Sequence, residues 1–509
     1  MTLGKVAIVG SGVAGATIAD ILLGNDAASK IVMFEAGNEV VMRDHRKWLD
    51  YITTGSLPYY WNEDDVTDAS GTENFWVKGG RLMAVGGSTL HWGGWCPRFK
   101  PEDFFLKSNT ERGLDWPFTY EDLTPYYVKA EQRLRVTGDG SRDDPPRHNE
   151  PYPVPKMPLA KKDGLIVNAL ENLGISSYGN LPIARSTSCQ TVGSCAYCPV
   201  GGRYDASMDI QSNFETFELR SKSPVAEIIM DSKKKAYGLR YVDMNTGEHQ
   251  QEEFDRIFVC GGSMESAKLL LSSRSRFWHS GLGNDTGHVG QHLSAHSLLR
   301  VTGQMPGNAS FLQQELDFPT LECRHFDVPE NQYKGKFYFV HDGRIGHYNI
   351  TKKLLAGTMP AQIDEERASG TGFGLAGFME EFAAPGSRIE LASGKNRFGL
   401  PKTNIVYTTS DITKSAKLEW LEKMEKILRV AGVDRDFRIK NGNPRADHTV
   451  SLCRMSDSAS EGVVDQNCKI HDCDNVHVVS NAVFPNLTAV NPTLTLVAVA
   501  IKVAENLSR

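Results

Sequence analysis

Short apolar runs alternate with glycine at the beginning of the chain. Residues 6–9 are Val-Ala-Ile-Val and lead directly into a glycine-rich turn, after which residues 16–23 carry apolar side chains at helical spacing. A second apolar run follows at residues 31–34. Apolar runs of this length, bounded by turn residues, are typical of buried strands. The pattern therefore predicts a strand, a tight turn, a helix and a second strand.

The end of the chain carries the longest apolar segment, residues 494–503, which only Lys502 interrupts. A segment that is apolar on nearly all sides predicts a buried helix. Asn491 suits the cap of this helix and Pro492 suits its first position. The segment is shorter than the ~18 apolar residues that cross a bilayer, so we expect no transmembrane segment.

Between these ends the pattern is less regular. Residues 300–440 alternate short strand-like runs with glycine turns, which predicts a sheet. The proline-rich residues 143–155 predict an exposed arm rather than a domain boundary.

Composition and charge limit the classes of protein to consider. A chain of 509 residues is too long for one core, so at least two domains are expected. Its 40% hydrophobic and 23% charged residues are typical of a soluble globular protein. A formal net charge of −6 gives no reason to expect nucleic acid as a partner. The first predicted strand begins too early to leave room for a cleavable leader, which by itself favours the cytoplasm.

The first turn has the pattern Gly-x-Gly-x-x-Gly. Gly10 permits the tight turn, Gly12 lets the backbone approach a pyrophosphate, and Gly15 allows close packing of helix and strand. The N-terminus of the following helix offers free N–H groups to phosphates. Glu35 ends the second strand, where a carboxylate accepts hydrogen bonds from ribose hydroxyls and disfavours NADP. The motif predicts a dinucleotide site but leaves FAD and NAD open, and a turn that binds nothing is the structural alternative.

A second glycine-rich segment spans residues 79–95. In it, Gly86, Gly87 and Ser88 are closely followed by His91 and a tryptophan. Glycine beside hydroxyl and aromatic side chains predicts backbone that lies against a large flat ligand. An ordinary surface loop is the alternative.

The N-terminus of the last helix is another candidate for ligand contact. Pro492 and Thr493 stand at its start, and the helix is expected to be buried. A buried helix N-terminus can stabilise the negative charge that a reduced flavin develops near N1 and the C2 carbonyl. A structural cap without a ligand explains the same residues.

In this order the motifs resemble the glucose-methanol-choline (GMC) oxidoreductase family. The nearest branch holds pyranose 2-oxidase, the FAD-dependent glucose and fructose dehydrogenases, and glucoside 3-dehydrogenase. The resemblance implies FAD as the cofactor, with Val225 and Gly261 among the residues that bind it. It runs nearly end to end, over residues 10–15, 86–92, 237–271, 281–290 and 491–495.

The fold that the resemblance implies is α/β plus α+β, with a Rossmann-like FAD-binding domain and an interleaved antiparallel-sheet substrate domain. The FAD-binding domain is expected to be discontinuous and to take residues 1–100, 205–300 and 440–509. The substrate-binding domain is expected to take residues 101–204 and 301–439, including a cysteine loop at 189–198.

The resemblance also implies a catalytic pair. His448 lies in a stretch similar to the family segment whose first histidine is the catalytic base, and Asn491 stands where the family has His or Asn. His448 would take the hydroxyl proton while Asn491 holds the substrate oxygen. Leu452 and Ser456 replace the usual Thr and Gly of the supporting loop. A buried structural histidine is the alternative for His448.

His91 is expected to lie beside the flavin. In pyranose oxidase-like sequences a histidine at this place, before tryptophan, carries a covalent bond to the flavin. Here Leu90 stands where that pattern has Thr, which favours a flavin held without the covalent bond.

Three cysteines, Cys189, Cys195 and Cys198, lie within ten residues at the spacing C-x5-C-x2-C. Such a loop is typical of a metal or iron–sulfur site. It resembles the segment that holds a three-iron cluster in the glucose and fructose dehydrogenases, although the last spacing here is one residue narrower. Zinc with a fourth ligand elsewhere, reduced thiols and a disulfide are the alternatives.

Together these features predict an FAD-dependent dehydrogenase that oxidises a secondary hydroxyl of a sugar or glycoside to a keto-sugar. A cluster would pass electrons on to a cytochrome c or a quinone, with a small subunit as partner. In the resembling enzymes that subunit carries the export signal, so the periplasm stays open beside the cytoplasm. An oxygen-using oxidase on the same fold and a non-catalytic flavin electron-transfer subunit are the alternatives.

Overall fold

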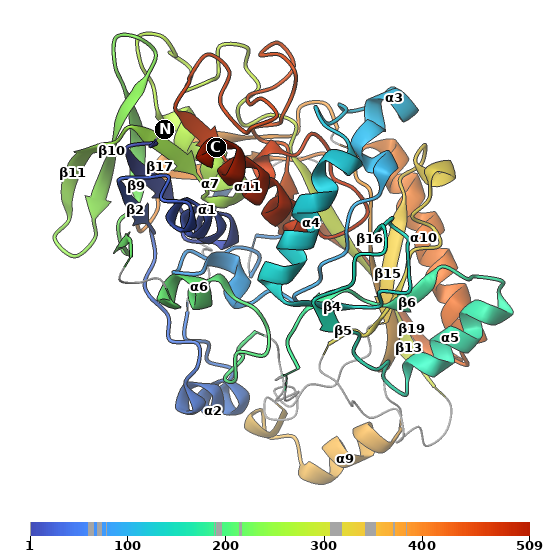
Figure 1. Ribbon diagram of the computed structural model, residues 1–509. Coiled ribbons are helices and arrows are strands. Elements are labelled where there is room, and N and C mark those ends of the chain that lie inside the picture. Colours follow the sequence, from blue (N-terminus) through green and yellow to red (C-terminus); the bar gives the residue numbers. More distant parts are fainter. Residues whose placement is uncertain are drawn as a thin grey trace.

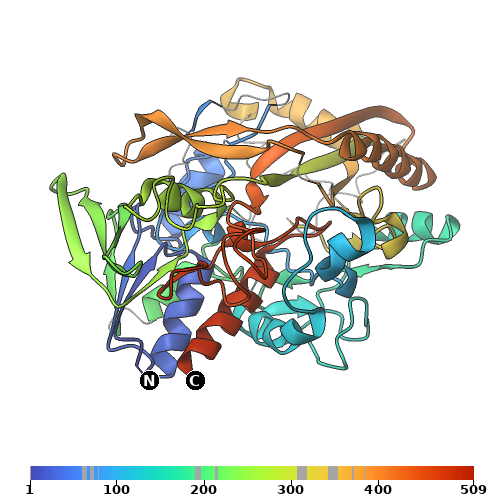
Figure 2. The same ribbon diagram turned by 90° about the horizontal axis from the view of Figure 1, so that it is seen from above.

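The computed structural model describes residues 2–509 apart from 60–65, 69–73, 78, 188, 190–195, 213–215, 306–317, 342–352, 370–371 and 383. Two sheet-based parts lie next to each other, and both chain ends belong to the first of them (Figures 1 and 2). Within the described ranges, no helix combines the length and the apolar character that a membrane span requires.

The first part is built on a parallel sheet in the order β20-β12-β1-β2-β8. In β1, the side chains of Val6, Ala7 and Ile8 are fully buried, as continuous apolar runs in parallel strands require. The predicted order of strand, turn, helix and strand is therefore confirmed. Its elements are β1 (Lys5–Val9), α1 (Val13–Gly24), β2 (Lys30–Phe34), β8 (Glu218–Arg220), β12 (Arg256–Val259) and β20 (Val476–Val478).

An antiparallel three-stranded meander packs on this sheet, with the ring of Phe34 in β2 lying 5.0 Å from that of Tyr241. It forms the edge of the molecule at the left of Figure 1. The meander is followed by β12 and then by α7, whose N-terminus faces the site described below. These elements are β9 (Val225–Met230), β10 (Ala236–Asp243), β11 (Glu248–Glu253) and α7 (Gly262–Ser272).

The C-terminal helix α11 (Thr493–Ser508) packs between α1 and α4 (Tyr120–Leu134) (Figure 1). Its residues from Leu494 to Ala504 are all buried, so the predicted buried helix is confirmed. The predicted cap is wrong, however. Pro492 occupies the cap position, where its side chain can form no hydrogen bond, and the Asn491 side chain contacts His448 instead.

The second part is built on an antiparallel sheet in the order β19-β13-β16-β15-β14-β6. Two helices cover it at the right of Figure 1. The prediction of a sheet over residues 300–440 missed one of them, the twenty-residue α10. These elements are β6 (Tyr178–Asn180), β13 (Ser294–Gln304), β14 (Leu321–Cys323), β15 (Phe337–His341), β16 (Gly372–Met379), β19 (Arg435–Val450), α5 (Asp163–Asn172) and α10 (Asp411–Val430).

Alternation along β13 separates two environments. Leu299 and Val301 belong to the same core cluster as Trp420 of α10. The alternate residues Leu298 and Arg300 line a large cavity on the other face of the sheet. β13 and β19 also cross the expected boundaries at residues 300 and 440, and the division into domains stays a prediction.

The proline-rich arm is exposed at most of its positions, as expected. Its Arg147 is buried and forms an ion pair with Glu131 of α4, which also pairs with Arg98. Beyond it, β5 (Val154–Pro155) pairs with β4 (Val136–Gly138). A buried arginine needs such a partner, so this pairing anchors the arm to α4.

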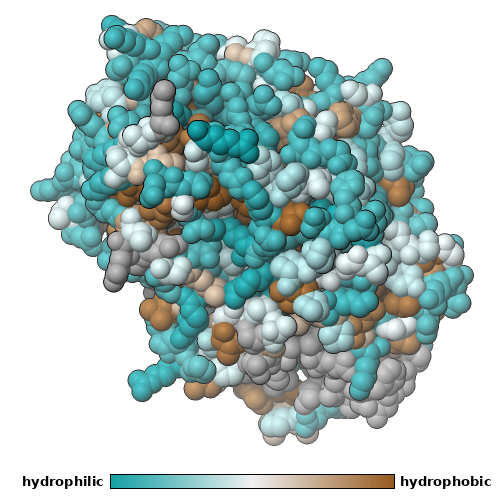
Figure 3. All heavy atoms as spheres, in the orientation of Figure 1, coloured by the Kyte–Doolittle hydropathy of each residue, from teal (hydrophilic) through white to brown (hydrophobic). Residues whose placement is uncertain are grey.

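The other described elements lie outside the two main sheets. The face of the molecule in Figure 3 is mostly hydrophilic, with apolar residues scattered over it. The remaining helices and strands are α2 (His45–Thr54), β3 (Val66–Asp68), α3 (Leu106–Thr110), β7 (Ile183–Ala184), α6 (Ala206–Ser212), α9 (Pro360–Ser369), β17 (Arg388–Lys395) and β18 (Pro401–Val406), with 3₁₀ turns at Gly87–Leu90, Pro101–Phe105, Pro329–Asn331 and Asn481–Val483.

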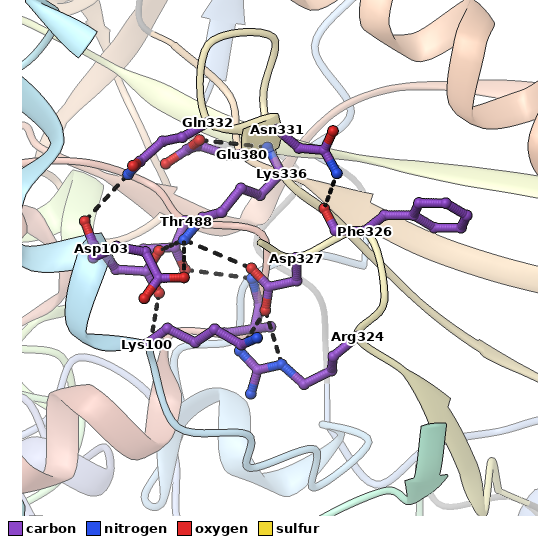
Figure 4. A network of polar contacts seen from close by, with 12 residues as sticks. Lys100, Asp103, Arg324, Phe326, Asp327, Asn331, Gln332, Lys336, Glu380 and Thr488 are labelled. Atoms are coloured by element: carbon purple, nitrogen blue, oxygen red, sulfur yellow. Dashed lines mark hydrogen bonds and ion pairs between the residues drawn. The ribbon is translucent and has the colours of Figure 1, made fainter. Parts of the chain in front are cut away.

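A buried ion network joins the antiparallel sheet to the segment before α3 (Figure 4). Lys336, immediately before β15, forms an ion pair with Asp103 and lies 3.7 Å from the Asp327 carboxylate. Arg324 donates from Nε to the same carboxylate at 2.8 Å. Burial lowers the pKa of Lys336, but the surrounding carboxylates raise it by more, so the lysine stays charged.

We expect Lys336→Ala to destabilise the protein by about 3–5 kcal/mol, because it leaves the buried carboxylate of Asp103 without its cation. Lys334→Ala is the matched control, since that side chain is 42% exposed and its pair with Glu419 contributes about 1 kcal/mol or less. Urea unfolding followed by tryptophan fluorescence measures both. Equal unfolding midpoints for the two variants would contradict the prediction.

Candidate active site

A cavity of about 820 Å³ lies between the two parts of the molecule. The first part supplies the glycine turn, the segment around His91 and the start of α11, and the antiparallel sheet supplies the opposite wall. The predicted residues that line this cavity are Gly10, Gly12, Glu35, Gly87, Ser88, His91, Val225, Gly261, His448, Asn491 and Thr493.

Three of the residues predicted to bind FAD do not line the cavity, and two of them are glycines with a structural role. A Cβ on Gly15 would lie 2.0 Å from the carbonyl oxygen of Gly10, which confirms the close packing expected there. Gly86 has a φ of 102° and begins the turn that carries His91. Pro492 precedes α11 with a helical backbone.

The nucleotide end of the cavity lies at the N-terminus of α1. Gly12 precedes this helix without a side-chain cap, and a Cβ placed on Gly12 would meet nothing within 4 Å. The first N–H groups of a helix have no partner within the helix, so they are available to a phosphate group here. The geometry therefore fits the pyrophosphate of a dinucleotide.

Glu35 lies at the end of β2 beside this turn. Its carboxylate accepts hydrogen bonds from the Ser11 hydroxyl at 2.6 Å and from the Gly37 N–H at 3.0 Å. Burial raises the pKa of Glu35, although these hydrogen bonds lower it. The carboxylate is thus fixed at the cavity wall, where a ribose would approach.

His91 follows the 3₁₀ turn Gly87–Leu90. Arg203 donates to the carbonyl oxygens of Leu90 and Trp92, both at 2.6 Å, and so fixes the backbone on each side of His91. Burial and the Arg203 charge lower the pKa of His91 to about 4, so the ring is neutral near pH 7. The structure places His91 in the cavity, and a flavin without the covalent bond stays a prediction.

The predicted catalytic pair meets in the same cavity. Nδ2 of Asn491 lies 3.3 Å from Nε2 of His448, which is carried by β19. A substrate hydroxyl placed here can donate its proton to the ring nitrogen while its oxygen accepts from the amide. Asn491 is positioned by the chain turn before α11, and the first turn of that helix also faces the cavity through Thr493.

Charged neighbours of His448 come from its own strand. Asp447 forms a bidentate pair with Arg445, with Nε at 3.0 Å from both carboxylate oxygens. Burial raises the pKa of Asp447, but His448 and Arg445 lower it to about 2, so the carboxylate stays ionised. Burial lowers the pKa of His448, while Asp447 opposes this shift.

Sequence reasoning missed a second histidine behind the first. His296, on β13, lies with its Nδ1 3.0 Å from Nδ1 of His448, and its Nε2 lies 2.7 Å from the carbonyl oxygen of Thr488. The signal that could have found it is the alternation in residues 294–304, which puts His296 on the same face as Leu298 and Arg300.

The rate of flavin reduction by substrate is expected to rise with pH, with a midpoint below pH 6.5. A histidine acts as a general base only when its ring is neutral, and burial lowers the pKa of His448 from its ordinary 6.5. The ionisable groups around the ring are Asp447, Arg445 and His296, and burial also keeps His296 neutral. Anaerobic stopped-flow traces between about pH 5 and 8 give the midpoint. A value above 6.5 would show that Asp447 outweighs burial.

The cysteine loop is described only in part. Cys195 lies outside the described residues, Cys198 is buried, and Cys189 accepts a contact from Arg185 at 3.7 Å. Tyr59 donates to the carbonyl oxygen of Ala196 at 2.8 Å and packs near the His91 ring, so this loop lies close to the cavity. No group of three metal-ligating side chains occurs in the part of the chain that the structure describes, and the cluster stays a prediction.

Comparison with known proteins gives the family. The models of the GMC oxidoreductase family match residues 8–298 with their N-terminal part and residues 384–500 with their C-terminal part. The chain belongs to the GMC oxidoreductase family. The family predicted from the sequence is therefore confirmed, and the protein is an FAD-dependent oxidoreductase that acts on CH–OH groups.

Relatives within the GMC family are distant but align nearly end to end. Fructose dehydrogenase large subunit of Gluconobacter japonicus is 23% identical over 98% of this chain and 97% of its own. C-glycoside 3-oxidase of Microbacterium trichothecenolyticum is 25% identical over 99% of this chain and 96% of its own. Paromamine 6'-oxidase of Streptomyces fradiae is 24% identical over 98% of this chain and 90% of its own.

Solved structures confirm the GMC fold predicted from the sequence. Pyridoxine 4-oxidase from Mesorbium loti superimposes with a TM-score of 0.66 at 17% identity, over 99% of this chain and 98% of its own. A formate oxidase superimposes with a TM-score of 0.68 at 16% identity, over 99% of this chain and 98% of its own. At such identities the likeness concerns the fold alone.

The described cavity fits the family's cofactor. Its volume lies within the ~300–1,000 Å³ typical of ligand sites. It is lined by two helix N-termini, at Gly12 and at Thr493, and by the hydrogen-bonding pair of His448 and Asn491. A dinucleotide with an extended phosphate link and a flat reactive ring has these requirements.

Proposed function

We propose that the protein is an FAD-dependent dehydrogenase that oxidises a secondary hydroxyl of a sugar or glycoside to a keto-sugar. The observation that carries this proposal is the contact between Asn491 Nδ2 and His448 Nε2, 3.3 Å apart, in the same cavity as the glycine turn. A base and an amide donor at this distance can hold one hydroxyl between them.

The walls around this pair support a sugar-like substrate. Trp95 and Phe378 present rings whose centroids lie 6.0 Å apart, and Arg300 and Thr302 add polar groups from β13. A sugar offers apolar C–H faces to aromatic rings and hydroxyl groups to polar side chains. Three relatives are named for fructose, a C-glycoside and paromamine, which agrees with this substrate class.

The chain's own residues account for the proton chemistry. FAD, when bound, supplies the hydride acceptor. His448 Nε2 takes the hydroxyl proton and holds it, and Asn491 Nδ2 donates to the substrate oxygen as its charge develops. Phe378 lines the cavity with its ring 4.9 Å from that of His448, and it limits the access of water to the reacting hydroxyl.

The electron acceptor is a separate part of the proposal. We propose a three-iron cluster on Cys189, Cys195 and Cys198, with a cytochrome c or quinone as acceptor, a small partner subunit and a periplasmic location. The cysteine spacing and the position of Ala196 beside Tyr59 support it, as does the relative named as a large subunit. The C-glycoside 3-oxidase relatives favour an oxygen-using oxidase as the second candidate.

Anaerobic bleaching of the flavin across a panel of sugars, glycosides and simple alcohols tests the substrate. We expect bleaching by one class of sugar or glycoside, with the new carbonyl group located on the ring by NMR. Bleaching by simple alcohols alone would contradict the substrate class. A flavin that no member bleaches would instead favour a non-catalytic electron-transfer subunit.

Iron analysis and peroxide detection test the acceptor. The cluster predicts about three irons per chain, lost in Cys198→Ala and kept in Cys473→Ala, whose cysteine is buried elsewhere. An iron-free protein that produces peroxide at full rate would show that the oxidase is correct.

A further inference from the structure

Two buried histidines lie ring to ring at the substrate end of the cavity. His296 and His448 have their centroids 5.2 Å apart at an angle of 74°, with Nδ1 facing Nδ1 at 3.0 Å. A hydrogen bond between two ring nitrogens needs a proton on one and a lone pair on the other. Which ring donates decides which nitrogen of His448 is free to act as a base.

The far side of His296 settles the assignment. Its Nε2 lies 2.7 Å from the backbone carbonyl oxygen of Thr488, which can only accept. Nε2 of His296 therefore carries the proton, and in a neutral ring Nδ1 then has only a lone pair. Nδ1 of His448 must donate to it, so Nε2 of His448 has no proton.

The other side of His448 agrees independently. Nδ2 of Asn491 is an amide donor and lies 3.3 Å from Nε2 of His448, where it needs a lone pair. Carbonyl, ring, ring and amide thus form one chain of hydrogen bonds with a single consistent direction. Thr488 and Asn491 belong to the same turn before α11, so this chain also fixes Asn491 relative to His448.

We propose that His296 is a positioning residue that holds neutral His448 in the tautomer with the proton on Nδ1, leaving Nε2 bare to take the substrate proton. The proposal goes beyond the residues that touch substrate or FAD, and it rests on the proposed role of His448 as the base. An imidazole in water prefers the other tautomer, with the proton on Nε2. The bond from His296 reverses that preference.

His296 does not carry the proton onward. Burial and the neighbouring His448 lower its pKa to about 3, so it stays neutral when His448 becomes charged. The Phe378 ring stacks on His296 at 4.9 Å and lies equally close to His448, which limits the access of water to the bond between them. The proton that His448 takes therefore stays on that ring until the site opens to solvent or product leaves.

¹⁵N NMR of the FAD-loaded, oxidised protein with labelled histidine tests the tautomer without any turnover. The His448 resonances are those absent from His448→Gln. We expect a protonated Nδ1 and an unprotonated Nε2 in the wild type, and the same in His296→Asn, whose amide oxygen takes the place of the Nδ1 acceptor. His296→Leu offers no acceptor at that position, so Nε2 of His448 should become protonated in this variant. A wild-type Nε2 that carries the proton would overturn the proposal even if no variant folded.

Stopped-flow reduction supplies the second measurement. His296→Leu should lower the limiting rate about tenfold or more, and His296→Asn should restore most of it. Equal losses in both variants, with unchanged His448 spectra, would show a merely structural role. A protein that no substrate reduces but whose spectra are as expected would refute the proposed function while leaving the tautomer intact.

Discussion

Replacing His448 by alanine is expected to lower the rate of flavin reduction by substrate about 10²-fold or more, with FAD retained. General base catalysis contributes on this scale, and His448 Nε2 is the nitrogen that meets Asn491 at 3.3 Å in the cavity. Loss of the imidazole leaves Asn491 to hold the hydroxyl without a group to take its proton. The measurement is the limiting rate in anaerobic stopped-flow traces, with the flavin absorbance as its signal.

His249→Ala is the matched control, because this histidine is exposed on β11 and does not line the cavity. Its reduction rate and flavin content should equal those of the wild type. The flavin content of His448→Ala should also match the wild type, since the alanine removes no contact at the glycine turn. A near-normal rate in His448→Ala would mean that another group takes the proton, and the proposed mechanism would fail.

The parts of the molecule that the sequence predicts are those specified by neighbouring residues. The glycine turn, the strand before it and the helix after it depend on Gly10, Gly12 and Gly15, and the structure reproduces all three elements. The buried C-terminal helix is equally local, because its apolar residues are consecutive. Such features need no knowledge of what packs against them.

The missed features depend on contacts between distant segments. The hydrophobic pattern does not predict α10, because only about half of residues 411–430 are apolar. The face that they bury is defined by the sheet that packs against the helix. The sequence around Asn491 predicts a helix cap, but in the structure its side chain contacts His448 instead. Neither outcome follows from the residues on either side.

His296 shows the same limit at the site. Its role requires β13 to pair with β19, which sets Ser294 opposite Val450 and brings His296 to His448. It also requires Thr488, from a third segment, to accept from the other ring nitrogen. No local pattern contains these three partners, whereas the family resemblance finds His448 because that residue lies in a motif.

Gly12→Ala is expected to weaken FAD binding about 10- to 100-fold without destabilising the protein that lacks FAD. Gly12 has a φ of −68° and a ψ of −176°, a backbone that any residue adopts, and an added Cβ meets no protein atom within 4 Å. The methyl group would instead occupy the space where phosphate approaches the N-terminus of α1. Losing one hydrogen bond to a charged group costs about 1.5–3 kcal/mol, which gives this loss of affinity.

Gly24→Ala is its matched control, because an added Cβ there also meets nothing within 4 Å and the residue lies at the far end of the same helix. Flavin titration of the apoprotein gives the affinity, and thermal unfolding gives the stability. Gly15→Ala should differ from both, because its Cβ would clash with the Gly10 carbonyl oxygen at 2.0 Å and so disturb the fold itself. If Gly12→Ala bound FAD as tightly as Gly24→Ala, the phosphate would not lie at this turn. The motif predicts cofactor contact for Gly12 and packing for Gly15, and the space around each residue agrees with that division.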